Sequence, residues 1–197
     1  VFEIDFSTGN PIPAGGLTFA GGSQSVAGPG DALVITNSSA FTSQTFNFTT
    51  FDANGFDGSI DINDGTVTRT ISFTGLEPIT SGTAADVIVN LPVGVANTDA
   101  VLRDHATTGF IEIAGGTFED TNFAVPTNSL TINLGNQGDT LTVNTLDSAF
   151  DSDLTITGGT GADSVQFATA VNVGTGESLT IASVEPIMAT AAAAAIK

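Results

Sequence analysis

The chain consists almost entirely of short runs in which apolar and polar residues alternate. In residues 2–6, for example, Phe2, Ile4 and Phe6 stand at every second position, with acidic residues between them. Because successive side chains of a strand point to opposite faces, this two-residue period predicts strands with one buried face. No segment keeps the 3.6-residue period of an amphipathic helix over three turns, and Gly, Asn, Asp and Pro fill the gaps. We therefore predict an all-β protein of many short strands joined by turns. The alternating runs are residues 2–6, 17–19, 33–35, 46–48, 60–62, 71–73, 87–91, 110–113, 130–132, 141–143, 154–156, 165–167 and 179–181.

The spacing of the later runs indicates which kind of all-β fold to expect. Leu130, Leu154 and Leu179 open three similar runs at intervals of 24 and 25 residues. Leu141 and Val165 open two more, 24 residues apart. A strand that returns at this interval is typical of a parallel β-helix, in which each coil stacks on the last. We expect a right-handed parallel β-helix or solenoid with coils of about 24 residues. Tandem β-sandwich domains are the alternative, because sandwiches also place strands every 8–12 residues.

A longer internal repeat is also visible. The segment Gly75-Leu-Glu-Pro-Ile79 returns as Ser183-Val-Glu-Pro-Ile187, with an offset of 108 residues. The same offset places the run 46–48 on 154–156 and the run 71–73 on 179–181. Gly30-Asp31 returns at this offset as Gly138-Asp139.

The front of the chain carries a second match. Phe2, Glu3 and Phe6 resemble Phe118, Glu119 and Phe123, and Pro13 and Leu17 resemble Pro126 and Leu130. We interpret the chain as a segment of a longer array of repeats, which need not begin or end at a repeat boundary. Residues 1–79 would be a first, partial repeat and 80–187 a second repeat of about 108 residues. Residues 188–197 would start a further repeat or form a tail, unless the whole chain is one continuous β-solenoid.

The charge of the chain limits its partners. With 21 acidic and 3 basic residues, its formal net charge is −18. Binding of nucleic acid or of an anionic membrane surface needs Lys and Arg, so neither partner is expected. Binding of divalent cations is compatible with this charge. The chain has no Cys, which excludes disulfides and thiolate chemistry. No apolar run approaches the roughly 20 residues of a membrane helix, so we expect no membrane insertion.

Several of these segments together resemble a known class of protein. Residues 130–143 and 154–165, with the runs at 118–132 and 75–79, are similar to units of very long repetitive surface proteins of planctomycetes and related environmental bacteria. The resemblance implies a secreted, extracellular or cell-surface role, and no catalytic activity.

One motif predicts a metal site. Residues 158–166 match the nonapeptide G-G-x-G-x-D-x-U-x of calcium-binding β-rolls, with Gly158, Gly161 and Asp163 at the motif positions. The glycines would allow a tight turn with inward carbonyls, and Asp163 would supply a hard oxygen ligand for Ca²⁺. If the coils repeat every 24 residues, Asp139 stacks on Asp163 and one cation can bridge them. The alternative is that both are ordinary Gly-Asp turns between strands.

Two other polar groups favour a structural interpretation. Asp147, Asp151 and Asp153 form a second acidic cluster, which we interpret as a solvated turn beside a buried Phe150. His105 is the only histidine, and the adjacent Asp104 would point to the opposite side of an extended chain. We therefore expect His105 in a solvent-facing loop rather than in a catalytic pair.

A β-helix carbohydrate-active enzyme is the catalytic alternative. Lyases of that kind need a basic residue over a cation-bound substrate, and only Arg69, Arg103 and Lys197 are available. Hydrolases need paired carboxylates in a cleft, usually walled by aromatic side chains, and the chain has no Trp or Tyr. We expect a non-enzymatic protein.

The favoured function is a structural repeat of a secreted bacterial surface or extracellular-matrix protein. Copies would assemble head to tail into a filament, sheath or surface layer, with extracellular polysaccharide as a further partner. A calcium-dependent adhesin module that binds a glycan or a partner cell is the alternative.

Overall fold

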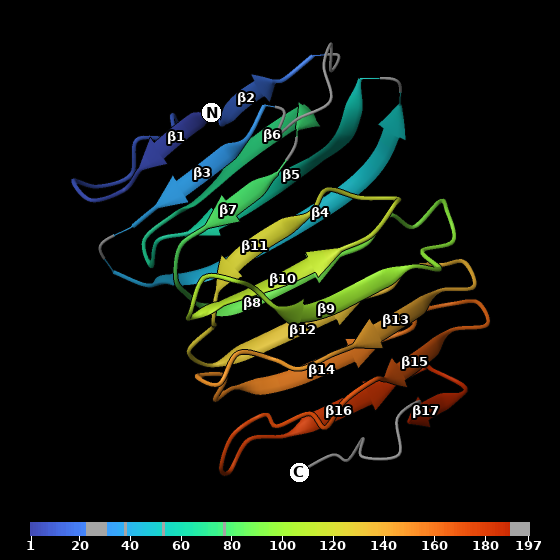
Figure 1. Cartoon of the computed structure of the whole chain (residues 1–197). Coiled ribbons are helices and arrows are strands. Elements are labelled where there is room, and N and C mark those ends of the chain that lie inside the picture. The colour runs from blue at the N-terminus through green and yellow to red at the C-terminus, as the bar shows by residue number, and fades with distance from the viewer. Residues whose placement is uncertain (23–30, 38, 53, 77, 190–197) are drawn as a thin grey trace.

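The structure is a computed structural model that describes residues 1–22, 31–37, 39–52, 54–76 and 78–189. In these ranges the chain forms strands that assemble into two sheets, named sheet A and sheet B here (Figure 1). The prediction of an all-β protein is therefore confirmed. Sheet A has nine strands, in the order β1 (Phe2–Asp5), β3 (Leu33–Thr36), β7 (Ile79–Ser81), β11 (Thr121–Ala124), β10 (Phe110–Ala114), β9 (Ala100–Asp104), β13 (Thr140–Val143), β15 (Ser164–Phe167) and β17 (Ile187–Ala189). Sheet B has eight strands, in the order β16 (Leu179–Ala182), β14 (Asp153–Thr157), β12 (Ser129–Asn133), β8 (Ala84–Asn90), β4 (Phe41–Asp52), β5 (Gly55–Asn63), β6 (Thr68–Leu76) and β2 (Leu17–Ala20).

The chain usually crosses from one sheet to the other after each strand. From β12 to β17 this crossing is regular, and each strand pairs in parallel with the strand two positions later. Leu130 pairs with Leu154 and Leu154 with Leu179, while Leu141 pairs with Val165. In this part of the chain the 24- and 25-residue intervals are therefore the offsets between parallel neighbours.

Two antiparallel meanders interrupt the crossing. Strands β4, β5 and β6 remain in sheet B, and β9, β10 and β11 remain in sheet A. Tight turns explain the first meander: β4 ends at Asp52 and β5 begins at Gly55, too few residues for a parallel crossover. At its second turn the Asn63 Oδ1 accepts a hydrogen bond from the Gly65 amide at 2.8 Å, and Gly65 has a φ of 92°. A positive φ of this size is readily adopted only by glycine, so the sequence fixes this reversal.

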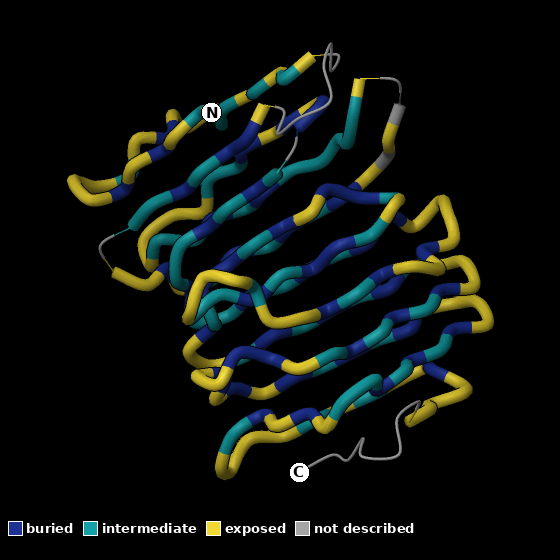
Figure 2. Tube along the Cα trace, viewed as in Figure 1, coloured by how far each residue is buried: buried dark blue, intermediate teal, exposed yellow. Residues whose placement is uncertain are grey.

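The apolar faces of the two sheets meet in one continuous core. Figure 2 shows buried residues along the strands of both sheets. In β14, for example, Leu154 and Ile156 are fully buried, whereas Thr155 and Thr157 on the opposite face are half-buried. Phe46 of sheet B and Phe123 of sheet A bring their ring centroids within 6.0 Å of each other. Burial of such a side chain contributes roughly 1.5–3 kcal/mol, so this shared core is the main source of stability.

The expected right-handed parallel β-helix is wrong, because the structure has two open sheets that mix parallel and antiparallel pairs. The physical reason is the two meanders, in which consecutive strands stay in one sheet and pair antiparallel through hairpin turns. The alternative of tandem β-sandwich domains is also wrong, because a single core extends through both sheets. The expected repeat boundaries stay a prediction, although β7 begins at Ile79 and β17 at Ile187, an interval of 108 residues. Of the expected final segment, residues 190–197 lie outside the described residues.

Candidate functional site

The predicted metal ligands lie in turns that connect sheet B to sheet A. Asp139 belongs to the turn between β12 and β13, and Asp163 to the turn between β14 and β15. The Asp139 amide donates a hydrogen bond to Asp163 Oδ1 at 3.0 Å. One turn earlier, the Asn97 amide donates to Asp139 Oδ1 at 2.7 Å. We call the three turns that contain Asn97, Asp139 and Asp163 the stacked turns.

Asn97 was missed by the sequence analysis, and it anchors one end of the stacked turns. Its side-chain nitrogen donates to the Leu134 carbonyl at 3.0 Å and to Asp139 Oδ1 at 2.9 Å. Its Oδ1 accepts from the Thr117 hydroxyl at 2.6 Å. Asn97 is fully buried, and these bonds satisfy the polar groups that burial would otherwise leave unpaired. The sequence signal was weak, since Asn97 follows a Gly-containing segment but lacks the nonapeptide pattern and stands 42 rather than 24 residues before Asp139.

In both Asp139 and Asp163, only one of the two carboxylate oxygens, Oδ1, accepts a hydrogen bond from a described residue. Asp139 and Asp163 expose 1% and 2% of their surface, and the Oδ2 atom of each has no hydrogen-bond partner among the described residues. Burial raises the pKa of Asp139, and the negative charge of Asp163 raises this pKa further. A buried polar atom without a partner costs about 1–3 kcal/mol, and an ionised one costs more. These two oxygens are therefore the atoms in the stacked turns best placed to take a proton or a cation.

The predicted glycines have a clear packing role. A Cβ at Gly158 would collide with the Ser183 carbonyl oxygen and would also lie against Asp163 Oδ2. Gly161 has a φ of 131°, and a Cβ there would collide with the Gln137 carbonyl oxygen. Both glycines thus permit close contact with a neighbouring turn, and this accounts for them without a metal.

A surface pocket opens beside Asp163, with a volume of about 390 Å³. Its lining includes Asp163, Glu185 and Ser183, residues that carry carboxylate or hydroxyl oxygens. Oxygen ligands of this kind are those that Ca²⁺ prefers. However, the described ranges contain no group of three or more His, Cys, Asp or Glu side chains arranged to hold a metal ion. A cation at Asp163 would thus need carbonyl oxygens or water to complete its coordination.

The second acidic cluster serves the local backbone. Asp147 accepts from the Ala149 amide and from the Gly109 amide, both at 2.7 Å. Asp153 accepts from the Ser178 amide at 2.7 Å, so it links β14 to the segment before β16. Phe150 is buried, as expected, but Asp147 is buried too, so the expected solvated turn is wrong for this residue.

His105 lies in the turn between β9 and β10. Its Nδ1 accepts a hydrogen bond from the Thr107 amide at 3.1 Å, and its ring contacts the edge of Phe110. In the part of the chain that the structure describes, the imidazole makes no hydrogen bond with a carboxylate. The Asp104 amide instead donates to the Thr145 carbonyl at 2.7 Å, which places this segment in the sheet framework.

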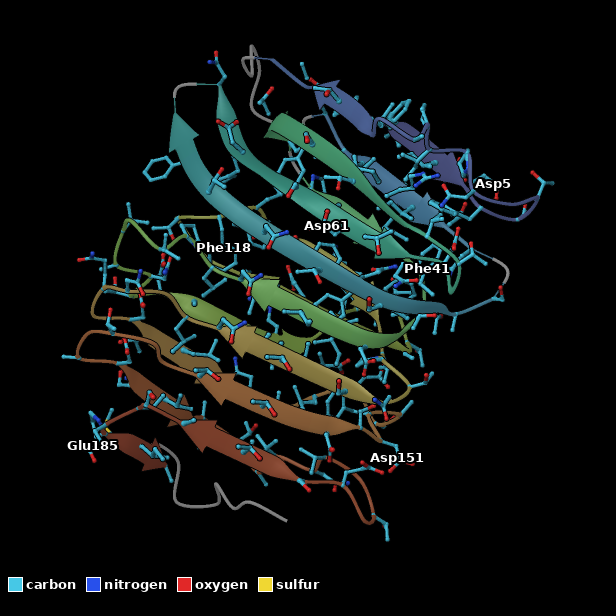
Figure 3. The ribbon with its side chains drawn as sticks, turned by 180° about the vertical axis from the view of Figure 1, so that it is seen from behind. Asp5, Phe41, Asp61, Phe118, Asp151 and Glu185 are labelled. Atoms are coloured by element: carbon cyan, nitrogen blue, oxygen red, sulfur yellow. The ribbon has the colours of Figure 1, made fainter. Side chains whose placement is uncertain are left out.

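The outer face of sheet B carries a second polar feature that the sequence analysis missed. Asn133 donates to Asn90 and Asn90 donates to Asn47, each at 2.7 Å. The chain of bonds ends at Asp61, labelled in Figure 3, which accepts from Asn47 at 3.1 Å and from the Thr70 hydroxyl at 2.6 Å. We call Asn47, Asn90 and Asn133 the asparagine ladder. Their constant interval of 43 residues was a visible signal in the sequence.

No family model matches the chain, and no curated protein or solved structure matches it either. The resemblance to planctomycete surface repeats therefore stays a prediction. Across the described ranges there is no helix with the length and apolar character needed to cross a bilayer.

Proposed function

We propose that the chain is a non-catalytic structural module of a secreted bacterial surface or extracellular-matrix protein, and that it assembles with copies of itself. The observation that carries the proposal is that both sheets are open. Among the described residues, sheet A ends at β1 and β17, and sheet B ends at β2 and β16, with the N-terminal strands at one end of the molecule and the C-terminal strands at the other (Figure 1). Strands at the edge of a sheet present unpaired amides and carbonyls, which another chain can pair with.

Within the described ranges, the C-terminal end also leaves apolar side chains uncovered. Val165 is fully buried, whereas its outer neighbour Ile187 exposes 51% of its surface. Leu154 is likewise fully buried, whereas its outer neighbour Leu179 is only partly buried. Covering these side chains would add stability in proportion to the apolar area removed from water.

Other features favour a structural role over catalysis. Polar side chains with several hydrogen bonds, such as Asn97 and Asp64, bond to the chain's own turns and strands. The stacked turns and the asparagine ladder both fix one strand against the next. Such networks rigidify a scaffold and specify its register.

Sedimentation velocity over a range of concentrations tests this proposal. We expect the weight-average sedimentation coefficient of the parent chain to rise with concentration. Ile187→Asp should abolish the rise, because it places a charge on an uncovered end. Val93→Asp is the matched control, since Val93 is similarly exposed, at 58%, but lies in a turn before β9. A parent chain that stays monomeric at every concentration would refute self-assembly.

A calcium-dependent adhesive module is the second candidate, and the unpartnered Oδ2 atoms of Asp139 and Asp163 are the observation in its favour. A ligand that binds only the folded state stabilises it by about 2.7 kcal/mol at a concentration of 100 times its Kd. The melting temperature in Ca²⁺ and in EDTA should then differ for the parent chain and for Asp104→Asn, a change at an exposed carboxylate, but not for Asp163→Asn. Equal melting temperatures of the parent chain in both solutions would exclude this candidate.

A further inference from the structure

The edge strands at the two ends of sheet A run in the same direction. Every pair from β1 to β17 is parallel except β11 with β10 and β10 with β9. The two antiparallel steps cancel, so β17 is parallel to β1. By the same count, β16 is parallel to β2 in sheet B, where β4–β5 and β5–β6 are the two antiparallel pairs. A second copy placed at one end by translation along the stack would therefore offer a parallel edge strand.

The interior of sheet A contains a pair of strands that indicates how two copies could join. Strand β7 pairs in parallel with β11, in the register Ile79 with Thr121, Thr80 with Asn122 and Ser81 with Phe123. The 108-residue offset relates β7 to β17, because Pro78-Ile79 returns as Pro186-Ile187. Strand β17 lies at the edge of sheet A, whereas its counterpart β7 is covered by a further strand, β11.

Strand β11, the partner of β7, also has a counterpart, which lies at the N-terminal end of the molecule. Phe2, Glu3 and Phe6 resemble Phe118, Glu119 and Phe123, and the last match places Phe6 at the position of the β11 residue Phe123. The burial of the two phenylalanines agrees, since Phe6 and Phe123 expose 8% and 0% of their surface. The segment that includes β1 therefore corresponds to the segment that covers β7.

We infer that a second copy of this chain docks head to tail by adding its β1 to β17, with the register of the internal β7–β11 pair. Ile187, Met188 and Ala189 then pair with Ile4, Asp5 and Phe6 of the next copy. This inference rests on the proposed self-assembly and names its joint. Sheet B has one strand fewer than sheet A, so the joint is assigned through sheet A alone.

The facing of the side chains fits this register. Ile187 is in register with the buried Val165, so it faces the core, as do Ile4 and Phe6 in β1 and just after it. Met188 and Asp5 face outward, and both are exposed. A shift of one residue would turn every apolar side chain of the joint to the wrong face. The outward pair joins a thioether to a carboxylate, so no two like charges oppose each other there.

The ends are far apart in one molecule, so the joint cannot close within a single copy. Asp5 lies at one end of the structure and Glu185, two residues before β17, at the other (Figure 3). Any link between Met188 and Asp5 must then join two copies, and such a link is the natural probe.

Disulfide formation between two single-cysteine variants tests the joint, since the parent chain has no Cys. Met188→Cys and Asp5→Cys, mixed and oxidised, would place Cα atoms about 4.8 Å apart, within the range of a disulfide. The matched control mixes Met188→Cys with Glu3→Cys, which faces the same side of β1 but is two residues out of register. That pair would be about 8 Å apart, beyond the reach of a disulfide.

We expect the Asp5→Cys mixture to form the mixed dimer about tenfold faster than the Glu3→Cys mixture. Equal rates, or a faster reaction at Glu3→Cys, would overturn the register. Concentration-dependent sedimentation without any Met188–Asp5 disulfide would overturn the joint and leave the proposed self-assembly standing. Monomers throughout would overturn both. Circular dichroism of each variant confirms that the exposed substitutions leave the fold intact.

Discussion

The asparagine ladder makes a quantitative prediction about stability. Asn90 is its central member, and Asn90→Ala removes two hydrogen bonds, one to Asn47 and one from Asn133. Asn133→Ala removes only the second of these. A neutral hydrogen bond contributes about 0.5–1.5 kcal/mol, and the ladder is half-buried, so water can partly replace the lost partner. We expect Asn90→Ala to lower the free energy of unfolding by about 1–2 kcal/mol and Asn133→Ala by about 0.5–1 kcal/mol.

The double variant distinguishes a ladder from independent side chains. Once Asn90 is removed, Asn133 has no ladder bond left to lose. The double variant should therefore lower the free energy of unfolding by no more than Asn90→Ala alone. The coupling free energy between the two sites is then about 0.5–1 kcal/mol. Asn and Ala are both poor strand residues, so the change in intrinsic propensity contributes little.

Urea-induced unfolding, followed by circular dichroism, measures these values if the slope m is the same in all four proteins. Additive costs of the two single substitutions would refute the hydrogen-bonded ladder. So would a cost of Asn133→Ala that equals or exceeds the cost of Asn90→Ala.

Three further predictions concern the stacked turns and the charge. Because the folded state raises the pKa of Asp139 above its ordinary 3.8, the folded chain binds this proton more tightly than the unfolded chain. Its contribution to stability is thus fully present below about pH 3.8 and is lost as the pH rises through the folded-state pKa. In EDTA, Asp139→Asn should therefore unfold at higher urea than the parent chain at pH 7 and lose this advantage at pH 3; an advantage that does not change with pH would contradict the burial of the charge. Gly161→Ala should destabilise the chain by about 1–3 kcal/mol more than Gly176→Ala, because both glycines have a positive φ but only a Cβ at Gly161 collides with a neighbouring turn. Equal urea midpoints of the two variants would refute the close stacking. Raising the ionic strength from about 0.01 M to 0.15 M shortens the screening length from about 30 Å to 8 Å, so sedimentation should show stronger association of chains with a net charge of −18; association that weakens with salt would argue against end-to-end contact between like-charged copies.

The strands were largely predictable from the sequence, whereas their partners were not. Each alternating run lies in or overlaps a strand, since burial of one face imposes the two-residue period directly. Strands β7, β9, β11 and β17 were missed because each has only one large apolar side chain on its inward face, the other inward residue being Ser81, Ala100, Thr121 or Ala189. Alternation also says nothing about direction, so β5 was read as part of a parallel coil.

The turn residues contained the missing information on direction. Asn54-Gly55 and Asp64-Gly65 are strong hairpin signals between alternating runs, and they mark both reversals of the first meander. The stacked turns were easier to find, because the 24-residue interval between Asp139 and Asp163 is also the offset of their parallel strands. Asn97 precedes Asp139 by 42 residues because the second meander inserts β10 and β11 between them, and this longer interval concealed it.

Cryo-electron microscopy of the concentrated chain tests head-to-tail stacking most directly. Sheet A has nine strands, and at a spacing of about 4.8 Å between strands they give a filament with an axial repeat of about 43 Å. The account predicts filaments with this repeat and with strands perpendicular to the axis. Isolated particles at every concentration, or filaments with an axial repeat unrelated to nine strands, would contradict it.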